Sequence, residues 1–310
     1  MSRLGDLLEG LAETDAVVGD LRQLGEIAPA DPTVPINLDA ALRRRSDLED
    51  ELAALLSRQQ LDLLRYRAEQ FDGSNVPAAH VARSIVLFQT LITAVFDAVR
   101  VGPKRHYLPP PESQRLSALQ FAQAPGASDA IHLVIPNEGL LAIESDVDAT
   151  LDLVFDLFAA RTKPAIRTIA ARAGIASVTA ARAWADNAVQ HGLTTTISWR
   201  RRKESPRTIT FSHSEALLFR TAIDAVADGA VEPRTEQCEL LAIDEIARTF
   251  RLIRFGGAMI VGDIADDFPP EGHWTTRRWY LADLVRVERI HYGTGEETVH
   301  WSLRALSPID

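Results

Sequence analysis

Apolar residues recur at helical spacing through the first hundred positions of the chain. A short stripe is broken at APADPTVP, and a longer stripe follows from about Leu38. Apolar residues three or four positions apart lie on one side of a helix, so the longer stripe predicts one amphipathic helix with a charged outer side. Its apolar members are Leu48, Leu52, Leu55, Leu56, Leu63 and Tyr66.

The next predicted helix begins near Pro77, a residue that suits the first helical turn, and runs to about Val99. It is apolar on most sides, so a two-helix hairpin alone could not cover it. Two ways of burying its apolar sides remain possible. One is internal packing against neighbouring parts of the chain, and the other is an interface with a second copy or another protein. Residues 1–102 are therefore interpreted as a helical region whose long hairpin is a candidate dimer interface.

The middle of the chain mixes both periodicities. Pro109, Pro110 and Pro111 favour an extended segment, which makes residues 103–116 a predicted proline-rich linker. Residues 117–230 are expected to form a mixed α/β domain. Its predicted strands lie at about 117–123, 131–136, 194–200 and 207–211, and its predicted helices at about 147–161, 164–173, 176–191 and 213–228.

The last part of the chain, residues 234–310, carries five regularly spaced segments of strand character. Gly256 and Gly257 join two of them and are a strong signal of a tight hairpin. Five short strands in a meander predict a small β-barrel of SH3 or Sm-like type. The expected fold class is thus α+β: a helical N-terminal region, a central mixed α/β domain that is winged-helix-like, and a C-terminal barrel.

Composition narrows the cellular compartment in which the protein is expected. The chain has 310 residues and a formal net charge of −10. Its single cysteine, Cys238, excludes an internal disulfide and favours a reducing compartment. The N-terminus lacks the basic region of a secretory signal, and Arg83, Asp97 and Arg100 interrupt the most apolar segment. We therefore expect a cytoplasmic protein with no membrane contact.

One stretch, IAARAGIASVTAARA at 169–183, has the pattern of two helices that cross over a short turn. Ala170 allows close approach, and Gly174 supplies a residue that tolerates positive φ. The stretch resembles the helix-turn-helix of bacterial regulators. With the two strands that come after it, residues 161–211 resemble a winged helix, in which the tip of a strand hairpin contacts the phosphate backbone.

That resemblance implies a set of DNA-binding residues. Bases of the major groove would be contacted by Ser177, Thr179 and Arg182. Phosphates would be contacted by Arg200, Arg201, Arg202, Lys203 and Arg207, and the first helix would be flanked by Arg167 and Arg172.

Local charge favours this interpretation. Residues 161–210 contain ten basic and only two acidic side chains, a basic island in an acidic protein. An alternative stays open, in which both hairpins belong to one sheet with helices packed against it. The basic residues at 200–203 would then form a solvated turn or a patch that docks on an acidic protein surface.

A second resemblance concerns Trp279-Tyr280-Leu281. These letters are similar to the signature of WYL domains, Sm-like barrels that usually follow a winged helix in bacterial regulators. The resemblance implies a ligand-sensing module in which Arg277 and Arg278 meet a nucleotide or nucleic acid. The chain departs from the family because RTFRLIRF precedes these letters instead of following them. The alternative is an ordinary strand that contains tryptophan and tyrosine, both favoured in strands.

No catalytic, cofactor or metal motif stands out, so no cofactor and no metal are expected. The first hypothesis is a DNA-binding protein, a transcriptional regulator that contacts duplex DNA through the central winged helix. The second is a non-enzymatic protein-docking subunit of a larger bacterial assembly, such as a defence system. An enzyme with an active site built from distant residues is the third.

Overall fold

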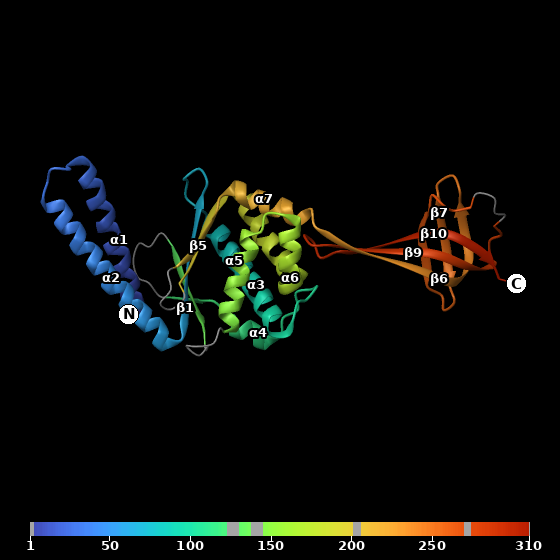
Figure 1. Cartoon of the computed structure of the whole chain (residues 1–310), viewed down its shortest axis with the longest axis horizontal. Coiled ribbons are helices and arrows are strands. Elements are labelled where there is room, and N and C mark those ends of the chain that lie inside the picture. Colours follow the sequence, from blue (N-terminus) through green and yellow to red (C-terminus); the bar gives the residue numbers. More distant parts are fainter. Residues whose placement is uncertain (1–2, 123–129, 138–144, 201–205, 270–273, 310) are drawn as a thin grey trace. The chain divides into compact units, whose positions relative to one another are not determined.

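The computed structural model of the chain divides into two compact units, Met1–Ile223 and Asp224–Asp310. It describes residues 3–122, 130–137, 145–200, 206–269 and 274–309 (Figure 1). The contacts thus join the predicted helical region and the predicted central domain in one unit. Both units together give the mixed α+β class that the sequence pattern predicts.

The first unit is built on a five-stranded sheet of order β2-β3-β1-β4-β5, in which every described pair is antiparallel. The central strand is β1, and the hairpin predicted at 194–211 forms one edge of the same sheet. This arrangement is the alternative in which the hairpins share a sheet. The strands are β1 (Leu61–Gln70), β2 (Gln120–Phe121), β3 (Ile131–Pro136), β4 (Leu193–Arg200) and β5 (Arg207–Phe211).

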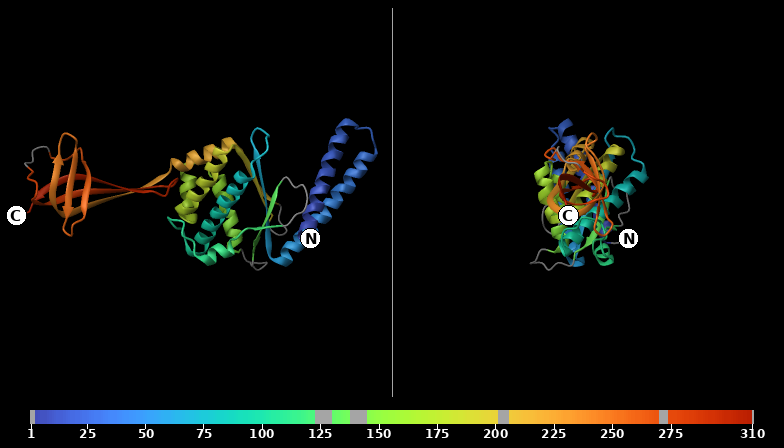
Figure 2. Two further views of the ribbon diagram at one scale, coloured as in Figure 1. Left: turned by 180° about the vertical axis from the view of Figure 1, so that it is seen from behind. Right: turned by 90° about the vertical axis from the view of Figure 1, so that its right-hand side faces the viewer.

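Helices cover both faces of this sheet, as Figure 2 shows from behind. One face packs on the hairpin of α1 (Arg3–Ile27) and α2 (Thr33–Gln59), where Leu63 and Val134 of the sheet join a leucine cluster. On the other face Tyr66 bonds to Ser84 and Trp184. The helices beyond that face are α3 (Ala78–Val101), α5 (Asp146–Ala159), α6 (Lys163–Gln190) and α7 (His213–Asp224).

The prediction of one helix through Leu63 and Tyr66 is wrong. Helix α2 ends at Gln59, because Gln60 adopts a left-handed conformation (φ 52°) and its N–H caps the carbonyls of Leu56 and Ser57. Strand β1 begins one residue later. A short apolar run has the same composition in a buried strand as in a helix, so spacing alone could not separate them.

The predicted linker contains a short helix, α4 (Pro111–Leu116). Buried Ser113 donates to Asp97 of α3 over 2.9 Å, and Lys104 forms an ion pair with the same carboxylate. Of the described helices, α3 alone is long and apolar enough to cross a membrane, yet residues 91–98 are all buried within the unit. Neighbouring parts of the chain therefore cover the second half of α3.

The second unit contains a closed five-stranded barrel, as predicted, but not a meander. Its strand order is β10-β8-β7-β6-β9, and β10 runs parallel to β8. The Gly256-Gly257 hairpin is confirmed, with positive φ at both residues. The strands are β6 (Ala227–Asp244), β7 (Thr249–Arg254), β8 (Met259–Ile264), β9 (Trp279–His291) and β10 (Glu297–Pro308).

Strand β6 starts well before its predicted position because it pairs with β9 from Ala227↔His291 to Glu239↔Trp279. Local sequence gives little sign of this, since Gly229 and Pro233 are poor strand formers. Beyond the barrel the pair continues as a two-stranded ribbon (Figure 1). Within the barrel the inward residues Cys238, Leu240, Phe250 and Leu252 form the core.

Candidate binding surfaces

The kink predicted at Gly174 is present. The two helical halves of α6 meet at this residue, which adopts φ 81° and ψ 157°. A Cβ added there would lie 2.5 Å from both the N and the O of Lys104. The neighbouring Ala176 N–H donates to that same Lys104 oxygen. Gly174 therefore serves both the positive φ and the close approach of a second backbone.

The second half of α6 is packed inside the unit. Ser177 is fully buried, and its hydroxyl donates to the carbonyl of Ala173 over 2.6 Å, so the prediction that it contacts DNA bases is wrong. Trp184 lies in the core and donates to Tyr66. Thr179 and Arg182 are half-buried, and the Thr179 hydroxyl donates to Ile175. Only a narrow side of this half-helix reaches the surface.

Two of the predicted phosphate contacts of the β4–β5 hairpin, Arg200 and Arg207, form ion pairs with carboxylates elsewhere in the unit. The Arg200 guanidinium lies 3.4 Å from Glu49. Arg207 pairs with Asp152 and Asp156 of α5 at 2.9 and 2.8 Å. Because these partners lie outside 161–210, the local count of basic residues overstates the positive charge of this surface. The other predicted contacts of the hairpin, Arg201, Arg202 and Lys203, lie outside the described residues.

Exposed cations remain on the first half of α6, where Lys163, Arg167 and Arg172 all reach the surface. Nearby Arg161 lies over the rings of Phe211 and Phe219, and burial lowers the pKa of its guanidinium. Arg161 thus packs against two core aromatic rings, so the described basic side chains of residues 161–210 divide between such internal contacts and the exposed group on α6.

A different surface stands out on the barrel. We call the exposed side chains Phe255, Met259, Val261, Trp279 and Leu281 the barrel face. Strand register aligns Met259, Ile253, Glu239 and Trp279 across β8, β7, β6 and β9. Phe255 is 87% exposed, and its ring centroid lies 6.1 Å from that of Trp279. Phe255 and Trp279 therefore adjoin, whereas Ile253 and Glu239 separate Met259 from Trp279. Aromatic side chains are enriched at protein interfaces.

Arginines border the barrel face. Arg277 and Arg278 directly precede Trp279, and Arg251 lies opposite Val261. All three are exposed, and none forms an ion pair with any residue that the structure describes. Of the letters that resemble a WYL domain, Trp279 and Leu281 face outward, while Tyr280 points inward and bonds to the backbone of Thr275.

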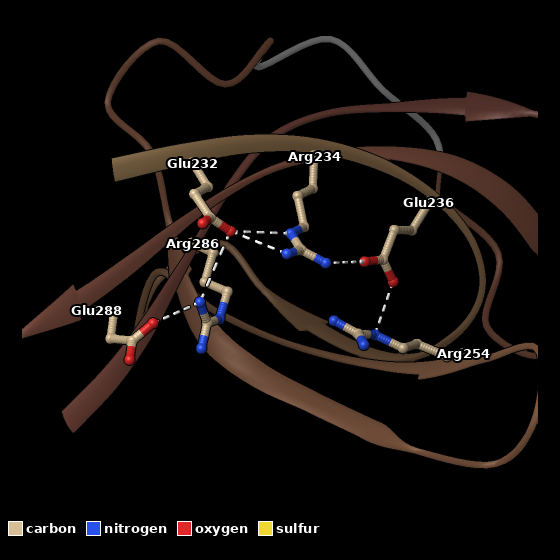
Figure 3. A network of polar contacts seen from close by, with 6 residues as sticks. All are labelled: Glu232, Arg234, Glu236, Arg254, Arg286 and Glu288. Atoms are coloured by element: carbon tan, nitrogen blue, oxygen red, sulfur yellow. Dashed lines mark hydrogen bonds and ion pairs between the residues drawn. The ribbon is translucent and has the colours of Figure 1, made fainter. Parts of the chain in front are cut away.

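Elsewhere on this unit, six charged side chains form a network of ion pairs. Figure 3 shows Glu232, Arg234 and Glu236 of β6 beside Arg286 and Glu288 of β9 and Arg254 of β7. Each of these residues forms an ion pair with the next one, in the order Arg254, Glu236, Arg234, Glu232, Arg286 and Glu288. The first pair measures 2.6 Å and the last 2.7 Å. Arg234 and Arg286 together lower the pKa of Glu232, the hydrogen bond from Arg234 having the largest effect. These ion pairs replace the apolar core where β6 and β9 leave the barrel.

Sequence reasoning missed the barrel face, although one signal was present. Met259, Ile260 and Val261 are consecutive apolar residues in a strand of a small barrel. Alternation sends the middle residue inward and leaves both neighbours in solvent. No signal of comparable strength indicated Phe255.

Comparison with known proteins identifies no relative: no family model, no curated protein and no solved structure matches the chain. Both resemblances therefore remain predictions. Within the described ranges, no group of three or more histidine, cysteine, aspartate or glutamate side chains could hold a metal ion.

Proposed function

We propose that this protein is a non-enzymatic subunit that docks on another protein through the barrel face. The observation that carries the proposal is the exposed pair Phe255 and Trp279 beside arginines without carboxylate partners among the described residues. Tryptophan and arginine are enriched among the side chains that dominate binding at protein interfaces.

The position of the face in the barrel supports this function. Strands β7 and β8 are the second and third of a closed five-stranded barrel, and in Greek-key barrels of that size these strands form the ligand-binding face. Such barrels also bind oligonucleotides. Here residues 224–310 carry sixteen acidic and nine basic side chains, and Met259, Val261 and Leu281 are aliphatic. Both features favour a protein over a polyanion.

The chemistry of the face also defines the partner. The partner would present an apolar surface to Phe255 and Trp279. Its carboxylates would lie where they meet Arg251, Arg277 and Arg278. Such pairs at the rim mainly raise the rate of association and suppress wrong partners.

The test captures binding proteins from a lysate of the source organism on immobilised protein. Phe255→Ser and Trp279→Ser should each weaken retention of one specific partner by about tenfold or more, and Arg277→Glu should slow its association. The matched control is Val299→Ser, an exposed valine of the same unit outside the barrel face. A partner retained equally by all variants contradicts the proposal. So does tight binding of single-stranded oligonucleotides that the two aromatic variants abolish.

Duplex DNA binding is the second candidate. It is supported by the order of the elements, a kinked helix followed by a strand hairpin, and by exposed Lys163, Arg167 and Arg172. If phosphates are bound, log K should fall linearly with log salt, and reversing the charges of Arg167 and Arg172 should reduce that slope by about two. Arg43→Glu, on α2, is the control. Absence of affinity at low salt would reject this candidate.

A further inference from the structure

A cavity of about 480 Å³ lies between the α1–α2 hairpin and the sheet of the first unit. Its walls come from α1 and α2 on one side and from β1, β3, β4 and β5 on the other. Cavities of this volume are typical of sites for small molecules. The cavity belongs to a different unit from the barrel face, so a ligand bound in it is independent of the proposed function.

The sheet side of the cavity carries a polar row. Strand register places His132, Arg65, Ser198 and Thr208 side by side across β3, β1, β4 and β5. The Ser198 and Thr208 hydroxyls bond to each other over 2.8 Å. The neighbouring row, two residues further along the strands, contains Val134, Leu63 and Arg200. In this row Leu63 and Val134 contact the leucines of the α1–α2 hairpin. The cavity therefore opens where the leucine cluster gives way to polar side chains.

Among the described residues that line the cavity, cations outnumber carboxylates. Three arginines line it, Arg45 from α2 and Arg65 and Arg200 from the sheet, against Asp15 and Glu49. Arg45 contacts Asp15 over 2.7 Å. Glu49 is shared between Arg45 and Arg200, with both guanidinium nitrogens at 3.4 Å. A tight charge-assisted bond measures about 2.7–2.9 Å. Among the residues that the structure describes, Glu49 at 3.4 Å is the one ion-pair partner of Arg200, so most N–H donors of Arg200 can serve a ligand.

One end of the cavity is apolar, while Asp15, Arg45 and Glu49 line a different part of the same two helices, α1 and α2. Leu8 and Leu11 of α1 and Leu52 of α2 line the apolar end, together with Leu63 of β1. A ligand here meets guanidinium groups at one end and aliphatic side chains at the other. We infer that the cavity binds a small amphipathic anion, with a carboxylate or phosphate head at Arg65 and Arg200 and a short aliphatic part against the leucines.

The experiment measures binding of octanoate and hexyl phosphate to the full chain by calorimetry. Both should bind with dissociation constants below about 1 mM, while hexylammonium should not bind. Arg65→Gln and Arg200→Gln should each weaken both anions by about tenfold, the loss of one charge-assisted contact. Arg43→Gln, a surface arginine of α2 that does not line the cavity, should leave them unchanged. Circular dichroism checks that each variant is folded.

Comparing the two anions with inorganic phosphate and hexylammonium separates the possible results. Equal binding of inorganic phosphate and hexyl phosphate would overturn the aliphatic part of the inference. Binding of hexylammonium as tight as that of octanoate would overturn the anionic part. Absence of binding at millimolar concentration, or equal binding by both cavity variants and the wild-type chain, would overturn the site as a whole.

Discussion

Gly174 joins the two halves of α6 in a backbone conformation that side chains rarely adopt, directly against Lys104. We expect Gly174→Ala to lower the free energy of unfolding by about 3 kcal/mol or more, because strain and contact with backbone atoms add together. Urea denaturation measures the loss. Gly19→Ala is the control, since Gly19 lies in α1 with no atom within 4 Å of the added carbon. It should be neutral or stabilising by up to about 1 kcal/mol. Equal effects of the two substitutions would refute this role for Gly174.

Cys238 is a second residue whose environment gives a definite expectation. Burial in the barrel core raises the pKa of its thiol to about 11, above the ordinary value of 9.0, with Glu236 contributing. The native thiol should stay protonated and resist iodoacetamide at about pH 8, while the urea-unfolded chain reacts readily. Because the folded pKa is the higher one, the thiol's contribution to stability is complete below about pH 9 and is lost as pH rises towards about 11. Fast alkylation of the native protein would contradict this.

At the scale of elements, the register of β1 depends on a buried carboxylate. Asp62 accepts from Asn137 and from the Trp199 indole, each over 3.1 Å. Asp62→Ala leaves both donors buried without this acceptor and should cost about 2–4 kcal/mol in chemical denaturation. Glu69→Ala on the same strand, an exposed partner of Arg67, should cost less than about 1 kcal/mol. A loss at Asp62 no larger than at Glu69 would show that this network does not hold the strand.

Most elements could be predicted from periodicity and turn residues, and those that could not share a cause. The helices around Gly174 and the barrel hairpin at Gly256-Gly257 follow from local chemistry that each segment carries itself. Strand β1 and the first half of β6 owe their state to partners far along the chain. The positive charge expected of residues 161–210 is reduced for the same reason at Arg200 and Arg207, because Glu49, Asp152 and Asp156 reach them only in the folded protein.

At the scale of the whole molecule, the division at Ile223 and Asp224 predicts two cooperative units. Each has its own core, so calorimetry should resolve two transitions. Leu64→Ala in the sheet and Leu240→Ala in the barrel remove equally buried side chains, and each should destabilise its own unit by about 2–5 kcal/mol. Each substitution should move one transition and leave the other in place. One transition moved by both substitutions would mean that the units fold as one.

The closing strand of the barrel has a consequence for synthesis. Strand β10 pairs with both β8 and β9, and it comes after them in the chain. While a ribosome is still translating residues 297–308, β8 has a bare edge whose backbone groups await hydrogen bonds. The strands of the first unit are complete by residue 211, so that unit can fold while the barrel is still open. In the interval between those two events the unpaired edge of β8 is open to pairing with another chain, which is a route to aggregation.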